Sequence, residues 1–243
     1  MPLYSFTNLR GPAGPAGATG AAGAAGASGV VDPSTTLQFY EDFVSDGFTA
    51  AAAVDALRSY QHAWRVTTDN PLAGSNVGGV VRLIPTSSTA PYLNHLMGGS
   101  NNGAGWVSPG KNPTIRVRYA QFGTGAATRM AGCHVAAGGG VTPADGIFWK
   151  ATVGGDITAV CRNSNSESIL SMATAAANGV FHELKAVVTG DGTSVEFFID
   201  DVSKGSIVTN IPSAALKPVA GSSNTTGVTD GIDVDYFHIT QTR

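Results

Sequence analysis

Two pairs of acidic residues have the spacing that acid–base chemistry on a β-strand would require. Glu196 with Asp200, and Asp233 with Asp235, are separated by even numbers of residues, so each pair would lie on one side of a strand. Retaining glycoside hydrolysis needs two carboxyl groups about 5–5.5 Å apart on one face. Asp200 and Asp201, however, follow the run SVEFFI as a hairpin turn would, where acidic residues are ordinary solvated turn formers. We therefore expect no catalytic residue and no enzymatic activity.

The histidines are scattered along the chain. None has a second ligand at the spacing of a metal-binding motif, and isolated histidines of this kind are usually structural. We therefore expect neither a metal site nor a cofactor. The histidines are His62, His95, His134, His182 and His238.

The two cysteines, Cys133 and Cys161, each lie in a predicted strand, with a third predicted strand around Phe148 and Trp149 between them. Strands two places apart in a sheet are about 9–10 Å from each other, beyond the Cα separation of about 7 Å that a disulfide tolerates. We expect free thiols that are buried as small apolar groups.

One long segment rich in glycine and asparagine, 91–113, could bind a ligand without a metal. An aromatic platform with amide groups beside it suits a sugar, and long loops in compact domains are often functional. The alternative is that its tryptophan packs into the core or against a neighbouring copy of the chain. The candidate ligand-binding residues are Tyr92, His95, Asn101, Asn102 and Trp106.

Composition excludes several classes of partner. Charged residues are 13% of the 243, the net charge is −3, and no cluster of Lys or Arg forms a basic patch, so nucleic acid is not expected as a partner. No apolar run approaches the roughly 20 residues that cross a bilayer, and the start MPLYSFTNLRG lacks the order of a signal peptide. We expect synthesis in the cytoplasm without membrane insertion.

A strict glycine period marks the N-terminal part of the chain. In a collagen triple helix every third residue faces the crowded axis, where only glycine fits, so this period predicts three chains and a homotrimer. The alternative is a flexible linker of small residues, because only Pro12 and Pro15 favour the polyproline geometry. The periodic glycines are Gly11, Gly14, Gly17, Gly20, Gly23, Gly26 and Gly29.

The segment before this tract contains four apolar residues among polar ones. It is too short to fold alone, and we interpret it as a peptide that docks to a larger particle, with a disordered terminus as the alternative. The expected organisation is a docking peptide at 1–10, a collagen-like stalk at 11–29, a linker at 30–36 and a head at 37–243. The docking residues are Leu3, Tyr4, Phe6 and Leu9.

From Leu37 onward, short apolar runs alternate with Gly, Asn, Pro and Asp, which is typical of an antiparallel β protein. In IRVRY, one face carries Ile115, Val117 and Tyr119 and the other carries two arginines, and the Asp-Gly in TGDGT predicts a tight hairpin. A helix is considered only at 50–60. The predicted strands are 79–84, 114–122, 129–136, 146–152, 157–163, 182–189, 194–200 and 234–240. A sandwich or jelly roll follows.

The C-terminal third resembles a known superfamily. The run FHELKAVVTGDGTSVEFFIDD and the closing DGIDVDYFHITQTR are similar to the last strands of concanavalin A-like lectins and glucanases, and FYEDF, Trp64, DGIFWK and ITAVCRNSN fit earlier strands. The resemblance covers 37–243 and implies a jelly roll of two large antiparallel sheets, one of them concave. The Glu-x-Asp-x-x-Glu strand of glucanases and the calcium cluster of legume-type lectins are both absent from this sequence.

Within this superfamily, the versions that look nearest are phage and prophage heads behind collagen-like repeats. The resemblance therefore implies a homotrimeric virion structural protein, a minor tail or fibre component. Its N-terminus would contact other virion proteins and its head would contact host-surface glycans. The alternatives are a capping or capsid-decoration protein without a ligand and, less favoured, a glycan depolymerase. The expected location is the virion.

Overall fold

The computed structural model describes nine segments of the chain: 35–41, 63–67, 80–83, 92–96, 105–123, 127–135, 143–151, 155–223 and 230–243. The chain divides into Met1–Val31 and Asp32–Arg243, and every described residue belongs to the second unit. The predicted docking peptide, the collagen-like stalk and the helix considered at 50–60 lie outside the described residues.

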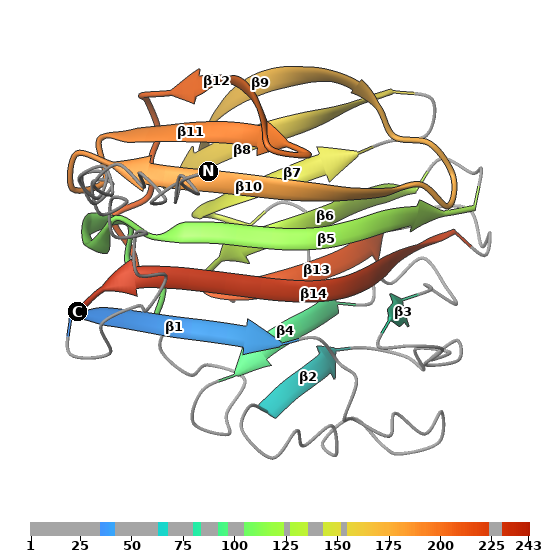
Figure 1. Cartoon of the computed structure of the whole chain (residues 1–243), viewed down its shortest axis with the longest axis horizontal. Coiled ribbons are helices and arrows are strands. Elements are labelled where there is room, and N and C mark those ends of the chain that lie inside the picture. The colour runs from blue at the N-terminus through green and yellow to red at the C-terminus, as the bar shows by residue number, and fades with distance from the viewer. Residues whose placement is uncertain are drawn as a thin grey trace, which may run out of the picture. The chain divides into compact units, whose positions relative to one another are not determined.

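Two antiparallel sheets form the second unit, and each has seven strands (Figure 1). Sheet A runs in the order β1 (Thr36–Glu41), β14 (Gly231–Thr242), β5 (Thr114–Phe122), β10 (Phe181–Thr189), β11 (Ser194–Ile199) and β12 (Val202–Ile207), with β3 (Val81–Leu83) also paired to β14. Sheet B runs in the order β2 (Ala63–Thr67), β4 (Tyr92–Leu96), β13 (Lys217–Ser223), β6 (Thr128–His134), β7 (Gly146–Ala151), β8 (Asp156–Asn163) and β9 (Ser166–Ala175). Among the described residues the single helical element is a 3-10 turn at Pro109–Lys111.

The alternation of side chains along β5 places the core between the sheets. Ile115 and Val117 are fully buried and Tyr119 is almost so, while Arg116 and Arg118 face away from the core. This confirms the period of two that IRVRY predicted. Apolar residues from both sheets join in one core, as a sandwich requires.

All eight predicted strands are present, with ends shifted by a few residues, as β3, β5, β6, β7, β8, β10, β11 and β14. Four strands escaped prediction. One is β4, which lies in the glycine- and asparagine-rich segment that was expected to be a loop. The other three do not alternate between apolar and polar side chains. Residues of β13 are buried on both faces, whereas β9 and β12 lie at the edge of their sheets and are largely polar. An edge strand needs few apolar residues, and a strand buried on both faces shows no alternation.

The hairpin between β10 and β11 has the predicted turn. Gly190, Asp191 and Gly192 have positive φ angles of 62°, 55° and 89°, which glycine and aspartate adopt more readily than other residues. The Thr193 hydroxyl donates to the Gly190 carbonyl oxygen at 2.9 Å and closes the turn.

Both cysteines are free and buried, as the sequence predicted. Cys133 on β6 and Cys161 on β8 are both paired with Ile147 on the intervening β7. Burial raises the pKa of the Cys161 thiol to about 12 and raises that of Cys133 well above its usual range. Both thiols therefore stay protonated and behave as small apolar side chains.

Candidate functional site

The face of sheet B that points away from sheet A carries a second apolar cluster, separate from the core between the sheets. Met130, Phe148, Val160 and Val219 form it, and none is more than 1% exposed. Their neighbours along the strands belong to the core between the sheets, so these four lie on the opposite side. We call this side the outer face of sheet B.

A row of polar residues crosses the same outer face beside this cluster. The strand register pairs Lys217 with His134, His134 with Gly146, Gly146 with Arg162, and Arg162 with Glu167. The row therefore spans β13, β6, β7, β8 and β9, five consecutive strands of the sheet. We call these five residues the polar row.

Three nitrogen atoms of the polar row are buried without a hydrogen-bond partner: Lys217 Nζ, His134 Nε2 and Arg162 Nε. Lys217 is 3% exposed and His134 is 6% exposed. Buried polar groups in folded proteins are almost always hydrogen-bonded, and lysine is rarely buried unless it is paired. Six side-chain atoms of the described residues are buried without a partner, and three of them lie in this one row.

His134 is held in one tautomer. Its Nδ1 lies 2.6 Å from the Val135 carbonyl oxygen, which can only accept, so Nδ1 carries the proton and Nε2 presents a lone pair. Burial lowers the pKa of His134 to about 4, the charge of Lys217 lowers it further, and the bond to Val135 opposes both. At neutral pH the ring is uncharged, and Nε2 can accept a proton or a hydrogen bond.

Gly146 allows close packing at the centre of the row. A Cβ atom there would lie 2.7 Å from Cδ1 of Phe148 and 2.9 Å from Cβ of His134, closer than real contacts allow. The aromatic ring of Phe148 therefore lies over the backbone of Gly146, beside the imidazole. An apolar ring next to unpaired polar atoms is the usual composition of a ligand site.

At the β9 end, the polar row is open to solvent and its charges are paired. Glu167 accepts hydrogen bonds from Lys150 at 2.9 Å and from Arg162 at 3.1 Å. Ile169, opposite Val160 in the register, is 62% exposed on the same face. The row thus leads from an accessible edge of sheet B to the buried nitrogens of His134 and Lys217.

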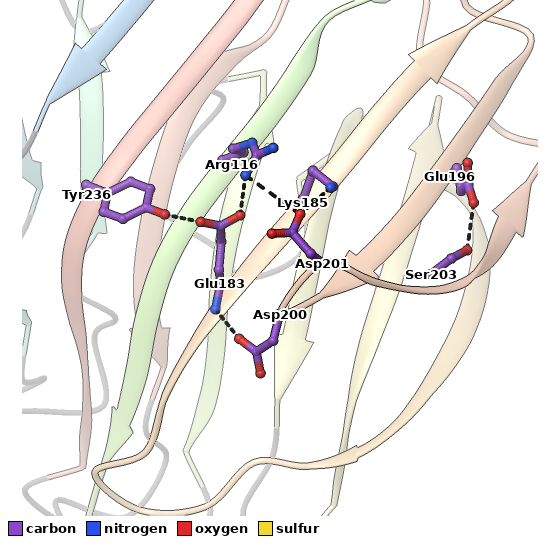
Figure 2. Close-up of polar contacts among 8 residues, drawn as sticks. All are labelled: Arg116, Glu183, Lys185, Glu196, Asp200, Asp201, Ser203 and Tyr236. Atoms are coloured by element: carbon purple, nitrogen blue, oxygen red, sulfur yellow. Dashed lines mark hydrogen bonds and ion pairs between the residues drawn. The ribbon is translucent and has the colours of Figure 1, made fainter. Parts of the chain in front are cut away.

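The outer face of sheet A is different, because its charged residues bind one another (Figure 2). Glu183 accepts from Arg116 Nη1 at 2.5 Å and from the Tyr236 hydroxyl, and Lys185 pairs with Asp201 at 2.5 Å. Ion pairs on a solvated surface contribute little to stability or function. We assign this face to solvent.

The acidic residues considered from the sequence all lie on the outer face of sheet A or in its turns, and Asp233 among them is buried. Glu196 accepts from the Ser203 hydroxyl at 2.6 Å, and Asp200 accepts from the Glu183 N–H at 2.9 Å and is paired with His182 at 2.7 Å (Figure 2 shows the first two contacts). Asp200 has a φ of 50°, in the turn after β11, which confirms that it is a turn residue.

Asp233 and Asp235 are held by arginines. Arg82 donates to both oxygens of Asp233 at 2.6 and 2.7 Å, and Arg118 donates to Asp235. Each carboxylate thus has its own guanidinium partner, and both are used in contacts within the sheet.

The residues expected to bind a ligand lie against the core, on a strand, or outside the described segments. The Trp106 ring packs against the core and lies 5.2 Å from that of Phe39, and the Trp106 backbone N–H donates to the Leu216 carbonyl oxygen at 2.9 Å. Tyr92 and His95 belong to β4, the neighbour of β13 in sheet B, rather than to a loop. Asn101 and Asn102 lie outside the described residues.

Sequence reasoning did not single out Lys217 or Arg162, and it took His134 for an isolated structural histidine. The one local indication of this site in the sequence was a lysine at the start of KPVAGSS, a run of mostly small and apolar residues. The described segments contain no group of three or more His, Cys, Asp or Glu that could hold a metal ion. Nor does any helix in these segments have the length and apolar character needed to span a membrane.

No family model matches the chain, and no curated protein matches it in sequence. Many solved structures have a similar fold, and three of them illustrate the range of their descriptions. The β-glucanase of Bacillus licheniformis has 14% identity and a TM-score of 0.58, with 83% of this chain and 97% of that one covered. The endo-1,3-β-glucanase of Streptomyces sioyaensis has 13% identity and a TM-score of 0.57, with 88% and 99% covered. The carbohydrate recognition domain of Emp47p has 10% identity and a TM-score of 0.55, with 87% and 99% covered.

These neighbours correct the expected function. Two of them are glycan-acting enzymes and the third is a carbohydrate recognition domain, whereas the sequence led us to expect a non-enzymatic structural protein of a virion. That expectation is wrong, because it relied on the collagen-like repeat and on the lack of one catalytic motif. At these identities the likeness concerns the fold, and the chain has the concanavalin A-like jelly-roll fold of two antiparallel sheets.

Proposed function

We propose that this chain binds a glycan across the outer face of sheet B. The observation that carries the proposal is the row of three buried, unpaired nitrogens on one face, from Lys217, His134 and Arg162. A sugar hydroxyl both donates and accepts hydrogen bonds, so it suits a lysine ammonium that donates beside an imidazole nitrogen that accepts. Neighbours named for glucanase activity and for carbohydrate recognition agree with this class of ligand.

The exposed Ile169 beside the polar row would serve the apolar surface of a sugar ring. Sugar rings present C–H groups on their faces and hydroxyls at their edges, and sites that bind them combine apolar side chains with a few placed polar groups. Ile169 at the exposed end supplies the first, and Arg162 and Glu167 supply the second. A glycan would therefore lie along the row, from β9 toward β13.

The collagen-like tract would multiply this binding. If three chains are joined by residues 11–29, three outer faces act together, and linked sites raise the effective concentration without new contacts. Each face then needs only modest affinity. Attachment to a phage particle through Leu3, Tyr4, Phe6 and Leu9, and the virion as location, stay predictions.

Glycan binding is tested with a pair of matched variants. Titrating the full chain with a panel of soluble polysaccharides by calorimetry should identify a ligand, and Ile169→Glu should weaken its binding about tenfold, since it places a charge where an apolar contact is expected. Val202→Glu is the control, because Val202 is equally exposed, at 59%, but lies on β12 of sheet A. Equal loss in both variants, or no binding to any glycan, would refute the proposal.

Cleavage of the bound glycan is a second candidate, favoured by the free Nε2 of His134, which can accept a proton from a reacting group. A pair of carboxylates on this face is less suited to cleaving a glycan. Asp156 and Glu167 stand about 20 Å apart along β8 by strand geometry, much farther than the 5–10 Å of glycosidases. Release of new reducing ends that stops in His134→Gln would establish cleavage; binding without release would reject it.

Trimer formation is tested at the centre of the glycine period. Gly20→Asp should reduce the mass measured by light scattering from three chains toward one, because no side chain fits at the axis of a triple helix. Ala21→Asp is the control, since this position faces outward and should leave the trimer intact. A trimer that survives Gly20→Asp would show that the stalk does not hold the chains together.

A further inference from the structure

We propose that the buried end of the polar row, made of Lys217 and His134, is an anion site that takes a carboxylate or sulfate group of an acidic glycan. This inference rests on the proposed function and specifies the class of glycan. The two residues are directly opposite in the register of β13 and β6, which brings their Cβ atoms to within about 4.5–5.5 Å. One group could therefore contact Lys217 Nζ and His134 Nε2 together.

The charges on the outer face of sheet B favour an anion over a neutral hydroxyl. Among the described residues in and beside the row, three are cationic, and the one carboxylate of the row, Glu167, already binds Lys150 and Arg162. Glu167 is on β9, three strands from His134, or about 14 Å by strand spacing. The charge of Lys217 is thus buried without compensation. Such a charge is costly, and an anionic ligand would remove that cost.

The tautomer of His134 makes anion binding dependent on pH. With Nδ1 bound to Val135, a neutral ring offers only a lone pair at Nε2, so it must take up one proton from solvent before it can donate to an anion. In the empty site, burial and the Lys217 charge hold the His134 pKa at about 4. A bound anion stabilises the protonated ring and raises this pKa.

The direction of the effect follows from linkage. Because the pKa is higher in the bound state, affinity increases as the pH falls below the bound value toward about 4. The described groups that face His134 from neighbouring strands are Lys217 on β13 and Gly146 and Phe148 on β7, with Arg162 beyond them on β8. None of these groups is acidic, so none of them supplies the negative charge that a bound anion would bring to His134.

The test uses calorimetry of the full chain with three probes at pH 5.5 and 7.5. The probes are trigalacturonate, which carries carboxylates, a sulfated carrageenan tetrasaccharide, and neutral laminarihexaose. We expect an acidic probe to bind at least about tenfold more tightly at pH 5.5, with close to one proton taken up, as measured in buffers of different ionisation enthalpy. The acidic probe that shows this behaviour identifies the anion as carboxylate or sulfate.

Two variants test the residues. Lys217→Met should abolish binding of the acidic probe and raise Tm by a few degrees, because it removes a buried charge without leaving a cavity. His134→Gln should keep weak binding but lose the pH dependence. Lys185→Met is the control, since Lys185 is also a partly buried lysine but lies on sheet A with a partner.

The outcomes separate this inference from the proposed function. Binding of laminarihexaose with equal or higher affinity, unaffected by Lys217→Met, would overturn the anion site and leave glycan binding in place. If no probe of the three binds while a wider panel yields a neutral ligand, the anion site also fails. If no glycan of any kind binds, both fail. Should Lys217→Met fold poorly, the proton uptake of the unaltered chain decides the question by itself.

Discussion

Replacing Trp149 by alanine is expected to lower the free energy of unfolding by about 3–5 kcal/mol, the cost of removing a large aromatic side chain from a packed core. Trp149 is 1% exposed and lies on β7 of sheet B, with its ring 5.9 Å from that of Phe197 on β11 of sheet A and nearly perpendicular to it, at 88°. The pair therefore joins the two sheets directly. Urea unfolding of the full chain, followed by circular dichroism, measures the change.

The contact itself is isolated by a double-mutant cycle. Trp149→Ala, Phe197→Ala and the double variant should give a coupling energy of about 0.5–1.5 kcal/mol, beyond the loss of buried area. Ile169→Ala is the control, because a side chain that is 62% exposed should cost less than about 0.5 kcal/mol. A Trp149→Ala chain that unfolds at the urea concentration of the original would contradict the assignment of this residue to the core.

Replacing Arg129 by methionine is expected to cost about 3–5 kcal/mol, because it leaves three backbone carbonyl groups without a donor. Arg129 is 1% exposed on β6, and it donates from Nε to Gly231 at 3.0 Å, from Nη1 to Ala127 at 2.9 Å and from Nη2 to Phe122 at 3.0 Å. Gly231 begins β14 and Phe122 ends β5. One side chain of sheet B therefore fixes the ends of two strands of sheet A.

The comparison variant is Arg129→Lys. Burial lowers the pKa of Arg129, yet a guanidinium stays charged at neutral pH, and only its planar group reaches three acceptors in fixed directions. Arg129→Lys should therefore restore part of the lost free energy of unfolding. The part that is not restored should appear as faster amide exchange near the start of β14. Full stability of Arg129→Met would mean that solvent reaches these carbonyl groups and that the residue does not hold the two sheets together.

The strands whose side chains alternate were predictable because alternation is a local property. In β5, Ile115, Val117 and Tyr119 could be assigned to the core from the sequence, and the Asp-Gly turn after β10 follows from the φ angles that these residues tolerate. The resemblance to concanavalin A-like proteins added the jelly roll. β9, β12 and β13 were not found, since edge strands and strands buried on both sides lack that pattern, and β4 lies in a segment that was expected to be a loop.

The functional inference failed where it depended on what the sequence lacks. Without a Glu-x-Asp-x-x-Glu strand, the chain was expected to be a non-enzymatic virion protein whose head contacts host-surface glycans, but the structural neighbours include glycan-acting enzymes. A missing motif excludes one arrangement of catalytic groups, and other groups on the same fold remain available. We propose His134 as such a group, and the lack of a partner for its Nε2 becomes visible only in the folded chain.

The sequence alone determined that an antiparallel β-sandwich follows the glycine period and that its two cysteines stay unpaired. Only the tertiary structure decided which residues meet. Lys217 and His134 are 83 positions apart in the chain, and they become direct neighbours because β13 enters sheet B beside β6. Local patterns encode which way a side chain points along its own strand. The order of strands in a sheet depends on how the whole core packs, and the polar row is a product of that order.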